Sequence, residues 1–351
     1  MPEDNVFMPE DNVEVRAERQ WSAGNHAAAL SLYLEAWTSP DNDVADKILD
    51  LVEDWGDTNA ALEAISAAAA AGNAGAYEAL ADLLIQLDRP AEAVSALQEA
   101  DHHGRNVTLW IAGILADEIE DHPRAEEYYQ RALAENHPNA LNDYGAFLRD
   151  GGERLDEAAD LLRQAVDQGD TMAAGNLGRL LLDQDKPAEA VGWLRQALEA
   201  GHRSVLVALG GAENDTGDSE AAGQHLREAL NEDLPGAHFA YALHLTDTGA
   251  LQEAVPHYEA ALDQDKETNA YLNLALLHEE LGQPEQADRR YRDAIEHEDE
   301  EAFLPYARFL AGQGRAEEIG ALLTRATSLD LAPEDLAELR VLADKGRPAG
   351  A

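Results

Sequence analysis

The sequence predicts an all-α fold, an α-solenoid of about ten antiparallel helix pairs with a capping helix at the C-terminus. A short element of small, large and small residues recurs ten times, at steps of 32 or 33 residues. A further small residue stands twelve or thirteen positions before most copies, and turn-forming residues lie between the two. A repeat of this length indicates helix pairs that bury their apolar faces only by stacking on their neighbours.

The recurring element predicts the second helix of each pair, called the B helix here. It reads A-x-x-x-[LYI]-x-x-A, and offsets of 0, 4 and 7 lie on one helical face. Small residues on both sides of a large one let a neighbouring helix approach closely. The ten copies begin at Ala29, Ala61, Ala93, Ala125, Ala158, Ala190, Ala222, Ala254, Ala287 and Ile319.

The small residue upstream predicts the first helix of each pair, the A helix, and is called its small anchor. An apolar residue usually precedes it, as in Leu177-Gly178 and Leu209-Gly210. In repeats three to ten the small anchors are Ala81, Gly113, Gly145, Gly178, Gly210, Ala242, Ala275 and Ala307.

Turn residues separate the helices. Between A and B stand glycines such as Gly217 and Gly249, or pairs such as Lys186-Pro187, where proline suits the first helical position. Several B helices are followed by a glycine, as at Gly72 and Gly201. Glycine there predicts a left-handed residue that ends the helix.

The pattern also predicts the domain organisation. Residues 14–332 form the repeat domain of about ten repeats, and residues 333–344 form the capping helix. Residues 1–13 contain Met-Pro-Glu-Asp-Asn-Val twice, and we interpret them as a flexible acidic leader. Residues 345–351 are predicted to be a disordered tail.

The repeat resembles the tetratricopeptide repeat, with a leaning towards the related Sel1-like class. The residues that carry the resemblance are clearest in repeat six, as Leu177-Gly178-x-x-Leu181 and Ala190-x₃-Leu194-x₂-Ala197. The junction Ala197-x₃-Gly201-His202 is similar to Sel1-like repeats. The resemblance implies protein–protein interaction through a concave groove lined by A helices, and it implies no chemistry.

Composition restricts the partners. The chain has 70 acidic and 25 basic residues, a net charge of −45. Phosphate backbones and anionic membrane surfaces would be repelled, so we expect neutral to basic protein or peptide partners, no nucleic acid and no membrane. The chain has no cysteine, no signal-peptide pattern and no apolar run of membrane-spanning length, so the sequence predicts a cytoplasmic protein.

Motifs for catalysis are missing from the sequence. It has no phosphate-binding loop, no G-x-S-x-G and no H-E-x-x-H. Asp263-Gln264-Asp265 looks like the start of a calcium loop, but Thr268 and Leu274 stand where glycine and glutamate are needed. We therefore predict a protein that is not an enzyme and has no cofactor or metal.

The family resemblance implies which side chains face the groove. Asparagine and arginine at the implied positions resemble a loose version of the clamp that some tetratricopeptide proteins use for a peptide carboxylate, although its lysines are missing. The alternative is that each arginine pairs with a carboxylate of an adjacent repeat. These polar candidates are Asn142, Arg149, Asn176, Arg179, Asn273 and Arg308.

Three aromatic residues are further candidates for the groove: Trp21, Trp110 and Phe239. If exposed, they would anchor a bound peptide or helix. The alternative is packing between repeats.

The predicted function is a non-catalytic scaffold or adaptor that binds a peptide or helical segment in the groove. The alternative is an acidic electrostatic receptor, or nucleic-acid mimic, for a basic protein. The two differ in salt dependence, because added salt screens exposed charges.

Overall fold

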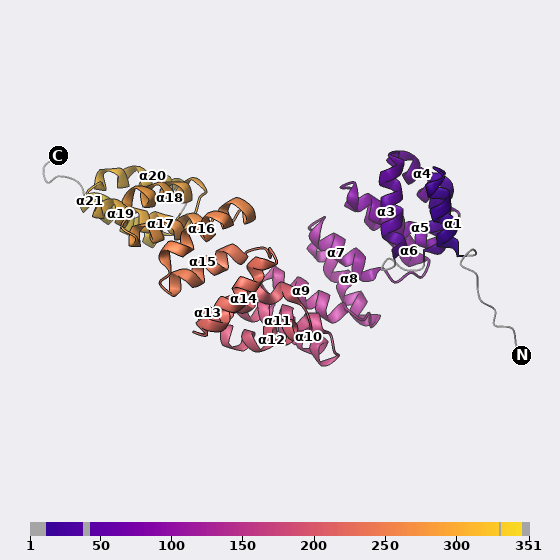
Figure 1. Ribbon diagram of the computed structural model, residues 1–351, viewed down its shortest axis with the longest axis horizontal. Helices are drawn as coiled ribbons and strands as arrows, with labels where there is room; N and C mark the ends of the chain where they lie inside the picture. The colour runs from indigo at the N-terminus through magenta and orange to yellow at the C-terminus, as the bar shows by residue number, and fades with distance from the viewer. Residues whose placement is uncertain (1–11, 38–42, 330, 346–351) are drawn as a thin grey trace, which may run out of the picture. The chain divides into compact units, whose positions relative to one another are not determined.

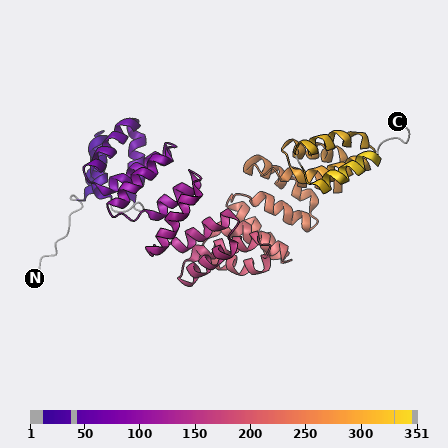
Figure 2. The ribbon, with the colours of Figure 1, turned by 180° about the vertical axis from the view of Figure 1, so that it is seen from behind.

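The computed structural model describes residues 12–37, 43–329 and 331–345, and within them all regular secondary structure is helical (Figures 1 and 2). The chain divides into two compact units, Met1–Ala165 and Val166–Ala351. Odd-numbered helices from α1 to α19 are the A helices, and even-numbered helices from α2 to α20 are the B helices. Ten pairs followed by a capping helix confirm the predicted fold.

The helix bounds are as follows. The first ten helices are α1 (Val13–Ser22), α2 (His26–Ala36), α3 (Asp43–Trp55), α4 (Thr58–Ala70), α5 (Ala74–Gln86), α6 (Pro90–His102), α7 (Thr108–Asp117), α8 (His122–Ala134), α9 (Ala140–Gly151) and α10 (Leu155–Asp167). The remaining helices are α11 (Thr171–Asp183), α12 (Pro187–Glu199), α13 (Leu206–Asp215), α14 (Ser219–Asn231), α15 (Ala237–Asp247), α16 (Leu251–Ala260), α17 (Ala270–Glu280), α18 (Pro284–Glu296), α19 (Phe303–Gly312), α20 (Ile319–Ser328) and α21 (Pro333–Lys345).

The small anchor of an A helix packs against the large residue of its B helix. A Cβ atom on Gly178 would lie 2.5 Å from Cγ of Leu194, and one on Gly210 would lie 2.5 Å from Cγ of Leu226. Atoms of real side chains do not approach this closely, so the two helices could not pack as they do with a larger residue there. The small anchor and the large residue are sixteen residues apart in the sequence because they are in contact across the two helices of a pair.

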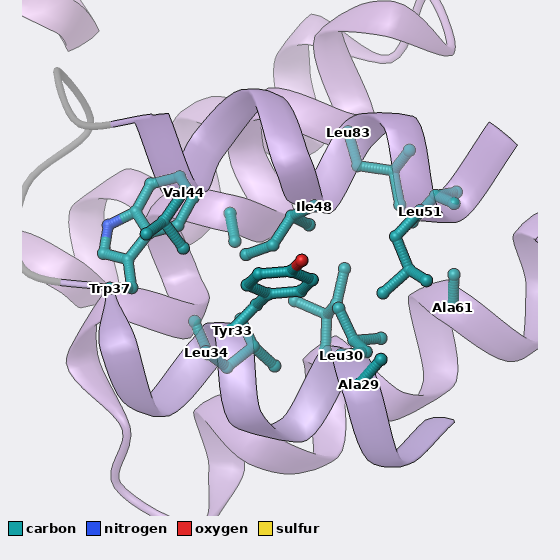
Figure 3. Close-up of a cluster of buried hydrophobic side chains, with 14 of the residues drawn as sticks. Ala29, Leu30, Tyr33, Leu34, Trp37, Val44, Ile48, Leu51, Ala61 and Leu83 are labelled. Atoms are coloured by element: carbon teal, nitrogen blue, oxygen red, sulfur yellow. The ribbon is translucent and has the colours of Figure 1, made fainter. Parts of the chain in front are cut away.

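The first unit contains a core built from several repeats (Figure 3). Tyr33 of α2 is fully buried at its centre, between Leu30 of the same helix and Ile48 of α3. Leu83 of α5 extends the same core to the third repeat. No single pair encloses these side chains, as expected for a repeat protein.

Left-handed residues end the helices as predicted. Gly72 and Gly201 have φ values of 97° and 98°. At most of the positions without glycine, an acidic or amide residue takes the same conformation, as at Asp185 with φ 57°.

One repeat contains an extra residue at the end of its B helix. The step from Ala254 to Ala287 is 33 residues, and after α16 the chain forms a π-helix over Ala261–Asp265 that ends at left-handed Lys266. A π-helical turn contains one more residue than an α-helical turn. The insertion is therefore absorbed before α17 begins.

The capping helix α21 packs on α19 and α20 and buries Leu339 in their core. The predicted leader and tail lie almost entirely outside the described residues, in 1–11 and 346–351.

Candidate protein-binding surfaces

The predicted polar residues lie on A helices in both units, and most already have partners within the chain. In the first unit, Asn142 is buried in α9 and donates to Oδ1 of Asp143 at 3.1 Å. Arg149, about two helical turns further on, donates to Oδ1 of Asp150 at 2.5 Å. Both side chains are therefore held by carboxylates of their own helix.

In the second unit, the predicted polar side chains are half-buried or exposed. Arg179 of α11 donates to the backbone oxygen of Ser204 at 2.9 Å, and half-buried Asn176 lies on the same helix. Asn273 donates to the backbone oxygen of Asn269, and Arg308 of α19 pairs with Glu338 of α21 at 2.7 Å. The pairing of Arg308 is the kind that the alternative interpretation expects.

The predicted aromatic residues are all half-buried. Trp21 donates from Nε1 to Asp54 at 2.7 Å and packs edge-on against Tyr33, while Phe239 packs edge-on against Tyr258. Trp110 lies on α7. Trp21 and Phe239 thus contribute to packing between helices, whatever else they bind.

The first unit contains a cavity of about 640 Å³ between α7, α8 and α9. Its floor includes Tyr129 and Phe147, and Gly113 lies in its wall. A Cβ atom on Gly113 would meet nothing within 4 Å, unlike one on Gly178 or Gly210. At this repeat the space beside the small anchor is open, and we call it the α7–α9 cavity.

A cluster of three aromatic rings supports the cavity. Tyr129, Tyr144 and Phe147 have ring-centroid distances of 5.7 Å (Tyr129–Tyr144), 4.9 Å (Tyr129–Phe147) and 6.3 Å (Tyr144–Phe147). The hydroxyl of Tyr144 donates to Oε1 of Glu126 at 2.7 Å, and Arg154 pairs with the same carboxylate. The hydrogen bond to Glu126 orients the ring of Tyr144, because a buried hydroxyl needs a partner.

The rim of the cavity is acidic. Asp117, Glu126, Asp143, Asp150 and Glu153 line it, against one arginine and one histidine. Burial raises the pKa of Tyr129, and the nearby carboxylates of Asp117, Asp143 and Asp150 raise it further. The negative potential therefore reaches the floor of the cavity.

The second unit exposes apolar side chains on its A helices. Leu243 of α15 and Leu276 of α17 directly follow the small anchors Ala242 and Ala275, and they are 37% and 43% exposed. Because they occupy equivalent positions in consecutive repeats, they lie on the same face of this unit. Asp247 stands four residues after Leu243, Glu279 stands three residues after Leu276, and both acidic residues are exposed. We call this surface the leucine face.

Neither surface was among the residues predicted from the sequence. The aromatic cluster requires the pairing of α8 with α9. A signal existed, because Tyr129, Tyr144 and Phe147 recur five repeats later as Tyr291, Tyr306 and Phe309.

No group of three or more histidine, aspartate or glutamate side chains in the described part of the chain is arranged to hold a metal ion. No helix among the described residues is long and apolar enough to cross a lipid bilayer.

The fold defines a helical-repeat protein, and its A helices carry the two candidate surfaces. Family models described as tetratricopeptide repeat match residues 74–99, 112–173, 171–208, 208–267 and 270–303, which together are more than half of the chain. The chain belongs to the tetratricopeptide repeat family. The leaning towards the Sel1-like class stays a prediction.

Solved structures show the same fold at low sequence identity. The human IFIT1 dimer with PPP-AAAA has a TM-score of 0.55 and 18% identity, covering 98% of this chain and 86% of that chain. The APC/C hetero-tetramer Cut9-Hcn1 has a TM-score of 0.55 and 13% identity, covering 96% of this chain and 76% of that chain. No curated protein sequence matches the chain significantly.

Proposed function

We propose that this protein is a non-catalytic scaffold that binds a peptide or helical segment of a neutral to basic protein on its A helices. The observation that carries the proposal is the leucine face. Two large apolar side chains are exposed at equivalent positions of consecutive repeats, beside acidic residues. Apolar residues in register suit the apolar side of a bound segment, and acidic neighbours favour basic residues at its edges.

The comparisons support this class of function. Cut9-Hcn1 is named as a hetero-tetramer, so a protein of this fold assembles with other chains. The IFIT1 structure contains PPP-AAAA. A net charge of −45 opposes binding of such a phosphate-bearing ligand, so we propose protein partners for this chain.

The test is selection of binders from a random twelve-residue peptide library with the full chain, at 0.15 M and 1 M NaCl. We expect enriched sequences to combine apolar with basic residues. We expect Leu276→Asp to weaken their binding about tenfold or more, because it places a charge against an apolar contact. The matched control is Leu87→Asp, which adds the same charge at a leucine of the first unit that is 36% exposed.

Other outcomes would contradict the proposal. Enrichment of acidic peptides, or of none, would remove it. Binding that disappears in 1 M NaCl and ignores Leu276→Asp would favour the electrostatic receptor instead. Binding of PPP-AAAA at 0.15 M NaCl would overturn the proposed class of partner.

A further inference from the structure

We propose that the α7–α9 cavity is a recognition pocket for an arginine side chain of the bound polypeptide. The inference rests on the proposed function, and it adds that the first unit recognises one type of residue, arginine, in the bound polypeptide. It concerns a different surface from the leucine face, in the other unit.

The cavity has the size and the lining to hold a side chain. Its volume of about 640 Å³ lies within the range of small-ligand sites. Tyr129 and Phe147 supply aromatic surface, and Phe147 is only half-buried. An aromatic ring at the base of an acidic recess attracts a cation through both its face and the surrounding charge.

The charges select a cation and reject an anion. Five carboxylates line the cavity, while Arg154 already pairs with Glu126 and Glu157. Asp117 is exposed on the rim and forms no ion pair with any described residue. An incoming cation therefore has a carboxylate available without having to displace an existing pair.

The chemistry favours arginine over lysine. A guanidinium is planar and weakly hydrated, stacks on an aromatic ring and donates to several carboxylates at once. Arg154 of the cavity lining already binds several groups at once: it pairs with Glu126 and Glu157 and donates to the hydroxyl of Tyr144 at 3.4 Å. Lysine offers a compact, strongly hydrated charge that fits such a recess less well.

The second unit has an arginine of its own at a position where the first unit has only a small side chain. At the position of Ala146, which lines the cavity, the equivalent repeat has Arg308. Its guanidinium donates from Nη2 to Oε1 of Glu338 at 2.7 Å. In one unit the chain provides its own arginine on this face, and in the other it provides alanine beside an acidic cavity.

The experiment is an NMR titration of the full chain at 0.15 M NaCl. The probes are three peptides, Ac-Ala-Arg-Ala-NH₂ and its lysine and citrulline analogues; citrulline keeps the shape of arginine without the charge. We expect the arginine peptide to shift amide signals of α7 and α9, the lysine peptide to bind several-fold more weakly, and the citrulline peptide to leave them unchanged.

Two variants locate the binding. Gly113→Leu should fill the cavity without changing charge, since a Cβ there has no neighbour within 4 Å, and it should abolish the shifts. Its control is Gly192→Leu, at a helical glycine of α12 that is equally free of neighbours. Asp117→Asn should weaken arginine binding about tenfold. Its control is Glu63→Gln, an exposed carboxylate of α4.

Equal binding of the arginine and citrulline peptides would overturn the inference. So would shifts that persist in Gly113→Leu, or the absence of shifts at millimolar peptide. In each of these cases, library peptides that still depend on Leu276 would leave the proposed function standing. Conversely, if library peptides no longer depend on Leu276 while the arginine peptide still shifts the signals of α7 and α9, the proposed role of the leucine face is wrong and the arginine pocket stands.

Discussion

The two units contain the same aromatic cluster, and they use it differently. Tyr129, Tyr144 and Phe147 correspond to Tyr291, Tyr306 and Phe309, five repeats later. The second cluster has ring-centroid distances of 5.2 Å (Tyr291–Tyr306), 5.4 Å (Tyr291–Phe309) and 6.4 Å (Tyr306–Phe309).

The polar support is also the same. Arg154 pairs with Glu126 in the first unit, and Arg315 pairs with Asp288 at 2.8 Å in the second. Each of these carboxylates accepts a hydrogen bond from the tyrosine of its own cluster, Tyr144 or Tyr306.

The difference lies in the residues around the rings. The first unit has Gly113, Asp117 and Ala146 where the second has Ala275, Glu279 and Arg308. Ala275 is fully buried, and the longer side chain of Glu279 accepts a hydrogen bond from the hydroxyl of Tyr291 at 2.9 Å. Differences at three positions therefore distinguish the two clusters. The first lies beside an open acidic cavity, whereas the residues around the second contact other groups of the chain.

The largest expected effect comes from removing a ring. Tyr144→Ala and Tyr306→Ala should each lower the free energy of unfolding by about 3–5 kcal/mol, because each empties a buried site between two other rings. Hydrogen exchange, followed by mass spectrometry in α8–α9 and in α18–α19, would assign the loss to one unit. A loss below about 1 kcal/mol in either unit would show that its cluster is not a core element.

The next effect concerns Glu126 and Asp288, the carboxylates that accept hydrogen bonds from Tyr144 and Tyr306. Glu126→Gln and Asp288→Asn should each cost about 1–3 kcal/mol, because charge-assisted hydrogen bonds to arginine and tyrosine are weakened. Urea unfolding at pH 7 measures both. A neutral result in both units would contradict the shared role of these acids.

Glu126 also makes a prediction about pH. Hydrogen bonds from Arg154 and Tyr144 hold the pKa of Glu126 below its usual value. The contribution to stability is therefore complete above the usual glutamate pKa of about 4.3 and is lost as pH falls through the lower folded value. The difference in melting temperature between wild type and Glu126→Gln should shrink from pH 7 to pH 3. A difference that grows on acidification would refute this assignment.

A smaller effect is expected at Glu279 and at Asp117, the equivalent residue of the first unit. Glu279→Asp should cost about 0.5–1.5 kcal/mol, because the shorter side chain loses the bond from the Tyr291 hydroxyl. The reciprocal change, Asp117→Glu, should stabilise the first unit by a similar amount if it acquires that bond to Tyr129. Thermal unfolding of both variants decides whether side-chain length alone explains the contrast.

The smallest effect is expected at Arg308. Its pair with Glu338 is exposed, so Arg308→Ala should cost less than about 1 kcal/mol, and less still in 1 M NaCl. If Arg308 instead belongs to the peptide-binding residues predicted from the sequence, the variant should weaken binding of selected peptides much more than it weakens folding.

Local pattern was enough to predict the fold. The spacing of Ala190, Leu194 and Ala197 specifies one face of a B helix, and Gly178 specifies where the A helix meets it. Each repeat contacts mainly its neighbours, so a correct repeat implies a correct stack.

The two candidate surfaces could not be predicted from the pattern alone. Whether the space beside a small anchor is filled depends on the partner residue: leucine fills it beside Gly178, whereas Tyr129 leaves it open beside Gly113. Position alone singles out the predicted arginines. No spacing reveals that Arg149 and Arg308 pair with carboxylates, or that Arg179 donates to a backbone oxygen. The exposed leucines cannot be told from core residues by pattern, because an apolar residue in a repeat predicts burial.

The π-helical turn at Ala261–Asp265 has a consequence for how such a chain changes length. A single insertion inside a helix would rotate every later side chain by about 100° and expose the core. Here the added residue widens the last turn of one helix, and the next repeat begins in its proper register. The ends of B helices are therefore places where a gene could gain or lose one codon without disturbing the repeats that follow, and where an engineer could do the same.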